Sequence, residues 1–217
     1  MNRVSAFLCL ALLPAFIACQ NHKAFTDRER QIIELSDSLM YVTVLPEDSV
    51  ILRTPSVDLG PKELQSSALR TLLDKMLYSV QHPSQDGVGI AAPQVGINRR
   101  IVCVQRLDKD GEPFEAYLNI RIDSLFGPVS VGPEGCLSVP GMRGLVPRHS
   151  GVVISYVQPR TLEPCRDTVE GYTAIIFQHE CDHLDGIMYI DKADTIYANP
   201  AWIAERAAYS YDRPSWW

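Results

Sequence analysis

The sequence predicts an α+β fold built from helices and short antiparallel strands. Helical runs and short β-rich runs follow one another without the strand–helix–strand alternation of a parallel sheet, and turn residues join one pair of β-rich runs. The chain has 217 residues, of which 46% are apolar and 21% are charged. That composition suits one globular domain with short appendages.

The first 18 residues have the composition of a secretory signal. Arg3 precedes an apolar run of about 15 residues, which is short of the ~20 that cross a bilayer as a helix. Cys19 directly follows Ala18, which resembles the lipobox of bacterial lipoproteins, although Phe16 stands where that pattern usually has an aliphatic residue. We expect residues 1–18 to be a signal peptide and Cys19 to carry a lipid that attaches the protein to a membrane of the bacterial cell envelope. If the signal is not used, the protein is expected in the cytoplasm.

Residues 19–40 read as an N-terminal extension that contains a helix. Thr26 and Glu29 form a capping box, in which each side chain accepts a hydrogen bond from the backbone N–H of the other residue. Apolar residues follow at helical spacing, so the pattern predicts a helix over 26–40. No repeat or low-complexity linker interrupts residues 41–192, which we take as one domain, and residues 193–217 form a tail.

A stronger helical pattern begins at Pro61 and ends at His82-Pro83, because the residue before a proline disfavours the helical conformation. Its apolar side chains lie on one stripe of the predicted helix. They are Leu64, Ala68, Leu69, Leu72, Leu73, Met76, Leu77 and Val80. We interpret this stripe as core.

Three β-rich runs follow this helix. The runs 101–105 and 114–122 flank Asp110-Gly111, which is a hairpin signal, and 151–157 is a further predicted strand.

The run 174–186 predicts three helical turns that end at Gly186. His179 and His183 are four residues apart, so both imidazoles project from one face of this helix. Glu180 completes a His-Glu-x-x-His pattern, in which the histidines bind zinc and the glutamate reaches a water molecule on the metal.

The alternative is a helix face whose histidines only hydrogen-bond to their neighbours. It explains the pattern poorly, because Glu180 lies beside Ile175, Ile176 and Phe177 and would be a partly buried carboxylate without a cation. Two histidines leave a tetrahedral metal short of one protein ligand and a water.

Three segments together resemble the signature motifs of peptide deformylases. They are Gly87–Gln94 (GVGIAAPQ), Glu134–Ser138 (EGCLS) and Gln178–Leu184 (QHECDHL), and their order and spacing also fit. The departure is Ile90 in place of the commoner leucine, which is an aliphatic exchange. The resemblance extends from about Leu52 to Asp191 and implies the deformylase fold, in which short antiparallel sheets pack around a central helix near the C-terminus. It also implies a catalytic domain over 41–192.

The resemblance implies that Cys136 is the third metal ligand, together with His179 and His183. Without it, a lone cysteine would be interpreted as a small buried apolar residue. The donor set suits Fe2+, Zn2+, Ni2+ or Co2+, and the resemblance favours Fe2+.

The implied reaction removes the N-terminal formyl group from N-formylmethionyl peptides or proteins and releases formate. Glu180 takes a proton from water and delivers it to the departing amine, while the Gln94 side chain and the Leu137 backbone N–H stabilise the oxyanion.

The resemblance also implies substrate contacts from Gly87, Gly89, Ile90 and Arg143. For Arg143 the alternative is an exposed side chain without a contact. The glycines superficially match a dinucleotide fingerprint, but no strand precedes them and Pro93 follows, so we reject a nucleotide site. We interpret them as letting the backbone pass close to a peptide substrate.

Three charged residues are expected to support the ligands. Glu134 and Asp182 are candidate acceptors, and Arg148 matches the arginine that pairs with them in the family. Ordinary surface ion pairs are the alternative for all three.

The remaining cysteines stay open to two interpretations. Cys103 and Cys165 are expected to be two buried apolar residues, with a disulfide as the alternative outside the cytoplasm. Cys181 is expected to point away from the metal face of its helix.

The charge distribution argues against a nucleic-acid partner. The net charge is −6, and residues 191–217 contain three basic against four acidic residues. We expect a monomer that acts outside the cytoplasm on released formyl peptides. A zinc endopeptidase and a non-catalytic peptide-binding lipoprotein are the alternative functions.

Overall fold

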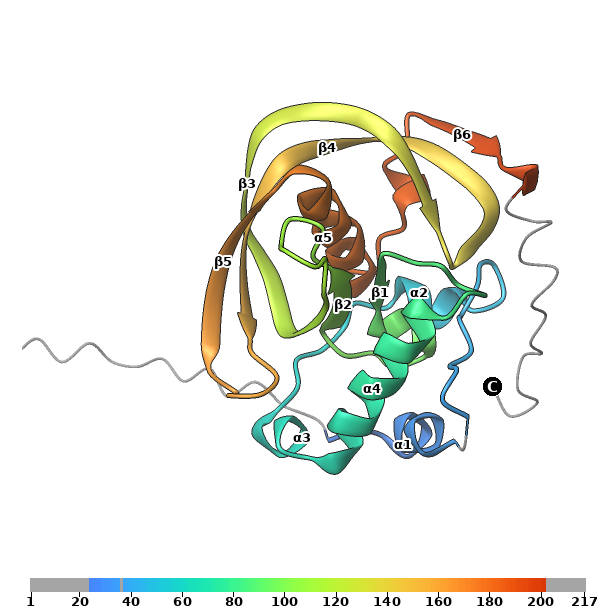
Figure 1. Cartoon of the computed structure of the whole chain (residues 1–217). Coiled ribbons are helices and arrows are strands. Elements are labelled where there is room, and N and C mark those ends of the chain that lie inside the picture. Colours follow the sequence, from blue (N-terminus) through green and yellow to red (C-terminus); the bar gives the residue numbers. More distant parts are fainter. Residues whose placement is uncertain (1–23, 36, 202–217) are drawn as a thin grey trace, which may run out of the picture.

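The computed structural model describes residues 24–35 and 37–201 (Figure 1). The predicted signal peptide, the lipid site at Cys19 and most of the predicted tail lie outside these residues. The helices are α1 (Asp27–Glu34), α2 (Ser49–Arg53), α3 (Pro61–Leu64), α4 (Ser67–Gln81) and α5 (Gly171–Leu184), with 3₁₀ helices η1 (Ala92–Val95) and η2 (Tyr189–Asp191). The strands are β1 (Gly89–Ala91), β2 (Ile101–Gln105), β3 (Phe114–Cys136), β4 (Val139–Val157), β5 (Pro164–Glu170) and β6 (Thr195–Ala198).

The strands form one antiparallel sheet in the order β1-β2-β3-β4-β5, and β6 pairs with β4. The predicted hairpin is confirmed, because β2 and β3 pair antiparallel and Gly111 adopts a φ of 76° in the turn. The expectation of short strands is wrong for β3 and β4, which have 23 and 19 residues. Residues 127–131 of β3 are exposed, so the strand continues there without the alternation of buried and exposed residues that predicts a strand.

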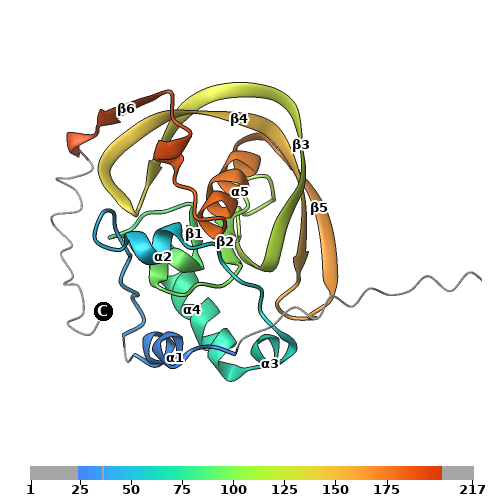
Figure 2. The same ribbon diagram turned by 180° about the vertical axis from the view of Figure 1, so that it is seen from behind.

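Register shifts divide the long β3–β4 pair into shorter stretches and allow it to curve. They lie at Leu118/Arg121, Ile122/Ser124, Phe126/Val129 and Gly135/Cys136. Seen from the front and from behind, β3 and β4 arch over α5 (Figures 1 and 2). The helix predicted over 174–186 therefore lies inside the curve of the sheet.

The core is divided between the two sides of the sheet. One apolar cluster joins α5 to the strands and includes Val102, Ile120, Ile154, Phe177 and Leu184. Another joins α4 to β2 and η1 and includes Leu69, Leu72, Met76, Val95 and Ile101. The apolar stripe predicted on the helix that begins at Pro61 is therefore core.

The helical run predicted from Pro61 forms two helices instead of one. The chain leaves the helical conformation at Ser66, whose hydroxyl accepts a hydrogen bond from the Leu69 N–H and begins α4. A serine at this position competes with helix continuation by capping the next helix.

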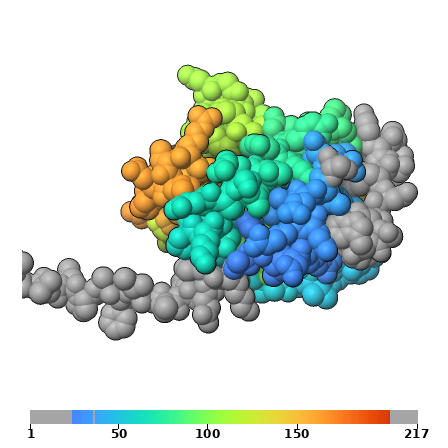
Figure 3. Space-filling view, turned by 90° about the horizontal axis from the view of Figure 1, so that it is seen from below, coloured from blue at the N-terminus to red at the C-terminus, as the bar shows by residue number. Residues whose placement is uncertain are grey.

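The N-terminal helix α1 packs on the domain and ends earlier than expected. Its capping box is present, but Leu35 is extended, so the helix stops at Glu34 and does not reach residue 40. Phe25, Ile32 and Ile33 are buried in the same cluster as α4. In Figure 3 these first described residues (blue) lie against the α3–α4 segment (teal).

A buried ion pair joins this segment to the domain. The Arg99 guanidinium donates to both oxygens of Glu29 at 2.9 and 2.8 Å, and their side chains are 2% and 8% exposed. Arg99 also donates to the Ala24 carbonyl at 2.8 Å and lies 5.2 Å from the centre of the Phe25 ring.

Within the described residues, every helix is too short or too polar to cross a bilayer.

We expect Glu29→Ala to lower the free energy of unfolding by about 3 kcal/mol, because it leaves the buried Arg99 guanidinium without its carboxylate. Urea unfolding measures the change. Glu34→Ala, at an exposed position of the same helix, is the control and should stay within about 0.5 kcal/mol of the parent. Equal effects of the two substitutions would show that α1 does not belong to the folding unit.

The same pair makes stability depend on pH. Burial raises the pKa of Glu29, but hydrogen bonds from Arg99 and Thr26 outweigh burial and lower the pKa below its ordinary value of 4.5. The stabilisation is therefore complete above that pH and is lost as the pH falls through the lowered pKa of the folded state. Glu29→Ala should remove this part of the acid dependence.

Candidate metal centre

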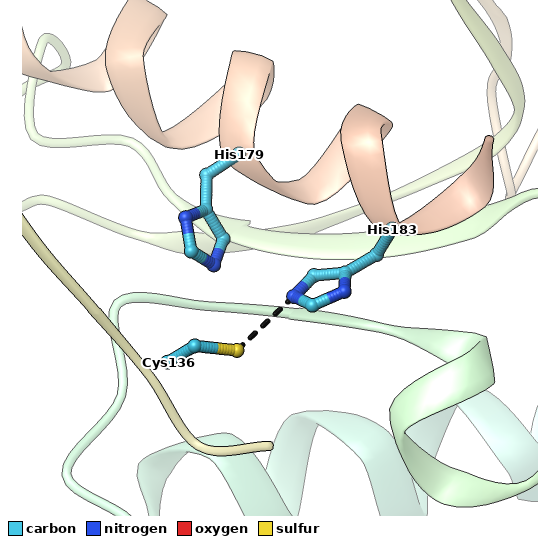
Figure 4. A group of neighbouring side chains, drawn as sticks. All are labelled: Cys136, His179 and His183. Carbon is cyan, nitrogen blue, oxygen red and sulfur yellow. Dashed lines mark hydrogen bonds between the residues drawn. The ribbon is translucent and has the colours of Figure 1, made fainter. Parts of the chain in front are cut away.

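Three donor side chains from two elements converge beneath the curve of the sheet. His179 and His183 project from consecutive turns of α5 toward Cys136 at the end of β3 (Figure 4). One ligand atom of each residue lies within 4.8 Å of the other two. The Cys136 Sγ is 3.2 Å from the Nε2 of His183, and the two imidazole centres are 5.0 Å apart.

The tight turn between β3 and β4 places the sulfur. The register shifts between Gly135 and Cys136, so Cys136 pairs with Val139 and the turn residues Leu137 and Ser138 lie beside the site. The Ser138 N–H lies 3.4 Å from the sulfur and the Gln94 Nε2 lies 3.5 Å from it. These two contacts and the turn fix the position of the sulfur, which is the atom that would bind a metal.

A buried network orients His179 from behind. The Nδ1 of His179 lies 2.8 Å from a Glu134 oxygen, and Arg148 donates to both oxygens of Glu134 at 2.7 and 3.0 Å. Arg148 also donates to Asp182 at 2.6 Å, and Lys192 donates to the other oxygen of Asp182 at 2.6 Å. Because Nδ1–H donates to Glu134, the Nε2 of His179 is left to face the site.

The network keeps Glu134 ionised. Burial raises its pKa, but hydrogen bonds from His179 and Arg148 outweigh burial and lower the pKa to about 2. These contacts are internal rather than ordinary surface ion pairs, because the Arg148 side chain is only 3% exposed.

The electrostatics of the cluster fit a bound cation. Burial raises the pKa of Glu180 to about 7 and drives the pKa of His183 well below its ordinary value. Burial also lowers the pKa of His179, but hydrogen bonds to Cys136 and Glu134 outweigh it and raise that pKa. Glu180 Oε2 and His183 Nδ1 are buried without a hydrogen-bond partner among the described residues.

A sulfur and two imidazoles at this spacing are a donor set for a divalent transition metal. The cation's charge would compensate the thiolate and the buried carboxylate. The residues therefore fit the metal that the sequence predicts.

Gly89 allows Glu180 to occupy its place. A Cβ on residue 89 would lie 2.5 Å from Glu180 Oε1 and 2.9 Å from its Cδ. The backbone of Gly89 has an ordinary negative φ, so the close carboxylate rather than the backbone conformation requires glycine. The sequence interpretation, which assigned this glycine to the substrate, therefore missed its contact with Glu180.

Gln94 is held in place by its own helix and by the Cys136 turn. Its Oε1 accepts a hydrogen bond from the Ala91 N–H at 2.8 Å, and its Nε2 lies 3.2 Å from the Ser138 hydroxyl. The side chain is 2% exposed. Its donor nitrogen therefore has a fixed position on the wall of the site.

A cavity of about 520 Å³ opens above the donor cluster. Most predicted site residues line it, namely Gly87, Gly89, Gln94, Cys136, Leu137, Arg143, His179 and Glu180. His183 is 1% exposed beneath the cavity, and Ile90 is fully buried in the α4 core cluster. The side chain of Ile90 therefore does not line the cavity, because alternate residues of β1 point to opposite faces. Its contact with the substrate stays a prediction.

Several residues of the site escaped the sequence analysis. Tyr172, Met142 and Asn199 line the cavity, and the Tyr189 ring stacks on His179 at 6.1 Å and 22°. Tyr189 lies six residues after His183, and no periodic pattern in the sequence indicated that its ring belongs to the site. Asn199 lies outside the predicted domain.

The other cysteines lie apart from the donor cluster. Cys181 is buried among the apolar side chains between α5 and the sheet, as expected. Cys103 and Cys165 are both free thiols, so they form no disulfide. Cys103 is buried, but Cys165 is partly exposed, which differs from the expected pair of buried residues.

Comparison with known proteins finds one family. The family model described as polypeptide deformylase matches residues 40–199. A peptide deformylase of Leptospira biflexa is 37% identical over 156 residues, which are 69% of this chain and 86% of that protein. A peptide deformylase of Symbiobacterium thermophilum is 42% identical over 153 residues, covering 70% of this chain and 67% of that protein.

Solved structures give the same result. The actinonin-bound class I type b peptide deformylase of Acinetobacter baumannii has a TM-score of 0.64 at 33% identity, covering 72% of this chain and 99% of that chain. A peptide deformylase of Synechococcus elongatus in complex with actinonin has a TM-score of 0.64 at 30% identity, covering 74% and 82%.

Protein purified anaerobically is expected to contain one transition-metal ion per chain, measured by plasma mass spectrometry. Cys136→Ser and His183→Ala should abolish this stoichiometry, because each removes a ligand. Glu134→Gln should weaken metal affinity by roughly 10–100-fold, because His179 loses its ionised acceptor. Cys165→Ser is the matched control and should retain the metal. Full metal content in Cys136→Ser would show that Cys136 is not a metal ligand.

Proposed function

The chain belongs to the polypeptide deformylase family, and we propose that Cys136, His179 and His183 hold its metal while Glu180 transfers the protons of the reaction. The protein is a peptide deformylase, a hydrolase that removes the N-terminal formyl group from N-formylmethionyl peptides and releases formate. The observation that carries the residue assignment is the convergence of three donor atoms within 4.8 Å at the cavity that Glu180 also lines.

Cys136, His179 and His183 would hold the ion. A divalent metal bound there would supply a Lewis acid that lowers the pKa of water and polarises the formyl oxygen. We propose Fe2+ as the native ion, with Zn2+, Ni2+ and Co2+ as ions that the same thiolate and imidazoles accept. The metal analysis above, carried out on anaerobic protein, identifies the ion.

Glu180 is placed to act first as a base and then as an acid. Its buried carboxylate takes a proton from water while the water oxygen bonds to the formyl carbon. The carboxylic acid then gives that proton to the nitrogen of the leaving peptide as the carbon–nitrogen bond breaks. The products are formate and a free N-terminus. A pKa raised to about 7 by burial suits both transfers near neutral pH.

We expect the Gln94 Nε2 and the Leu137 N–H to stabilise the oxygen that gains charge when the formyl carbon is attacked. The Gln94 Nε2 is fixed beside the Ser138 hydroxyl and the Cys136 sulfur, and the Leu137 N–H belongs to the turn that carries this sulfur. A fixed donor aimed at a developing oxyanion contributes about 3 kcal/mol to lowering the barrier.

The site of action is proposed from the N-terminal residues. The basic start, the short apolar run and Cys19 after Ala18 support a monomeric lipoprotein of the bacterial cell envelope. Mass spectrometry of the N-terminal peptide should find a lipid on Cys19, and Cys19→Ser should move the protein from the membrane to the soluble fraction. An unmodified Cys19 in soluble full-length protein would place the enzyme in the cytoplasm.

Formate release from formyl-Met-Ala-Ser is expected to fall at least 100-fold in Glu180→Ala, because the variant loses the group that accepts and returns the proton. Metal content should stay at the parent level, since Glu180 is not a ligand. Cleavage of unformylated peptides by the parent would instead indicate an endopeptidase. Binding of the formyl peptide without formate release would indicate a non-catalytic protein.

Gly89→Ala tests the same role without removing the carboxylate. The new Cβ would displace Glu180, so kcat should fall at least tenfold while the protein remains folded and metal-loaded. Gly132→Ala is the matched control, because a Cβ there meets no atom within 4 Å and its φ is not positive. Equal activity of the two variants would contradict the positioning of Glu180 by Gly89.

A further inference from the structure

A cationic side chain lies on the wall of the cavity beside the metal ligands. Arg143 of β4 pairs with Gly135, the residue that precedes Cys136. A Cβ on Gly135 would lie 3.8 Å from the Cγ of Arg143 and 4.0 Å from its Nε, so the aliphatic part of Arg143 runs along the backbone of Gly135. Arg143 is exposed and lines the cavity, which directs its charge at the substrate side.

The guanidinium of Arg143 has no counter-ion among the described residues. Over residues 24–35 and 37–201, no hydrogen bond or ion pair engages the Arg143 guanidinium, and Arg143 is the one lysine or arginine in the cavity lining. The carboxylate of Glu134, which lines the same cavity, is already bound to Arg148 and His179. No ion pair joins Arg143 to Asp86, the remaining exposed carboxylate of the lining.

The C-terminal strand adds a polar neighbour to Arg143. In the β4–β6 pairing, Met142 lies opposite Ala198 and Arg143 lies opposite Tyr197. The next residue, Asn199, donates its backbone N–H to the Gly141 carbonyl at 2.7 Å and lines the cavity. Figure 1 shows β6 along the outer part of β4. Sheet pairing therefore holds Arg143 and Asn199, which we call the polar rim, beside the mouth of the site.

We propose that the polar rim binds the free α-carboxylate of short formyl peptides, so that released formyl di- and tripeptides are the preferred substrate class. The proposal rests on the deformylase function above. A guanidinium binds a carboxylate through two parallel N–H donors, and an amide side chain adds a further donor. The carboxylate of a short substrate would give Arg143 the counter-ion that it lacks among the described residues.

The length of the substrate decides whether its carboxylate reaches the rim. An extended chain advances about 3.3–3.6 Å per residue, so the carboxylate of a tripeptide lies roughly 7–10 Å beyond the methionine Cα. Arg143 is the Cα partner of Gly135, the residue before Cys136, so the rim lies next to the turn that carries the metal ligand. A longer formylated chain presents neutral peptide groups at the rim and carries its carboxylate away from the cavity.

The experiment compares kcat/KM for formyl-Met-Ala-Ser and its C-terminal amide, and for an acid and amide pair of eight residues, on the metal-loaded enzyme. Wild type should favour the tripeptide acid over its amide by roughly five- to tenfold, mostly through KM, because an exposed charge pair is screened by solvent. The ratio should approach one for the eight-residue pair and should fall for the tripeptide as NaCl is raised.

Arg143→Gln should bring the tripeptide ratio close to one, because it removes the charge and keeps a polar side chain. Arg160→Gln is the matched control, since Arg160 is exposed on the turn after β4 and does not line the cavity. A wild-type ratio of one for the tripeptide, or an unchanged ratio in Arg143→Gln, overturns the role of the rim. Absence of formate from all four peptides would instead overturn the proposed function itself.

Discussion

The site depends on one buried guanidinium that ties the sheet to the central helix. Arg148 of β4 holds Glu134 of β3 and Asp182 of α5, and Glu134 in turn holds the imidazole of His179. The element that carries the cysteine and the element that carries the histidines are thereby joined by charge-assisted hydrogen bonds. Because the network is buried, loss of a partner would leave a charge uncompensated, so the geometry of the donor cluster and the packing of α5 are maintained together.

The reacting side of the cluster follows a different principle. Glu180 is buried and has one oxygen without a hydrogen-bond partner among the described residues. Gly89 provides space for this carboxylate, and burial raises its pKa to about 7. Glu134 is fully hydrogen-bonded behind His179 and its pKa is lowered, whereas Glu180 has an oxygen without a partner among the described residues and its pKa is raised. Both glutamates belong to motifs of the same family, but their surroundings shift their pKa values in opposite directions.

Some of these features could be predicted from single segments of the chain. The helical repeat places His179 and His183 on one face, and the capping box at Thr26 and the Asp110-Gly111 turn act within a few residues. The length and curvature of β3 and β4 could not be predicted in this way. Register shifts interrupt their alternation, and residues 127–131 are exposed, so no local pattern marks them as strand.

By itself, the sequence determined the donor chemistry: two imidazoles one helical turn apart, a glutamate between them, and motifs that identify the cysteine as their partner. Only the tertiary structure decided that the sulfur of residue 136 meets those rings, that Gly89 makes room for Glu180, and that Asn199 and Tyr189 belong to the site. The physical reason is the distance along the chain over which each kind of interaction acts. Helical period and turn preference act over a few residues, whereas the contacts between β3 and α5 join positions more than 40 residues apart, which only the packing of the folded sheet brings together.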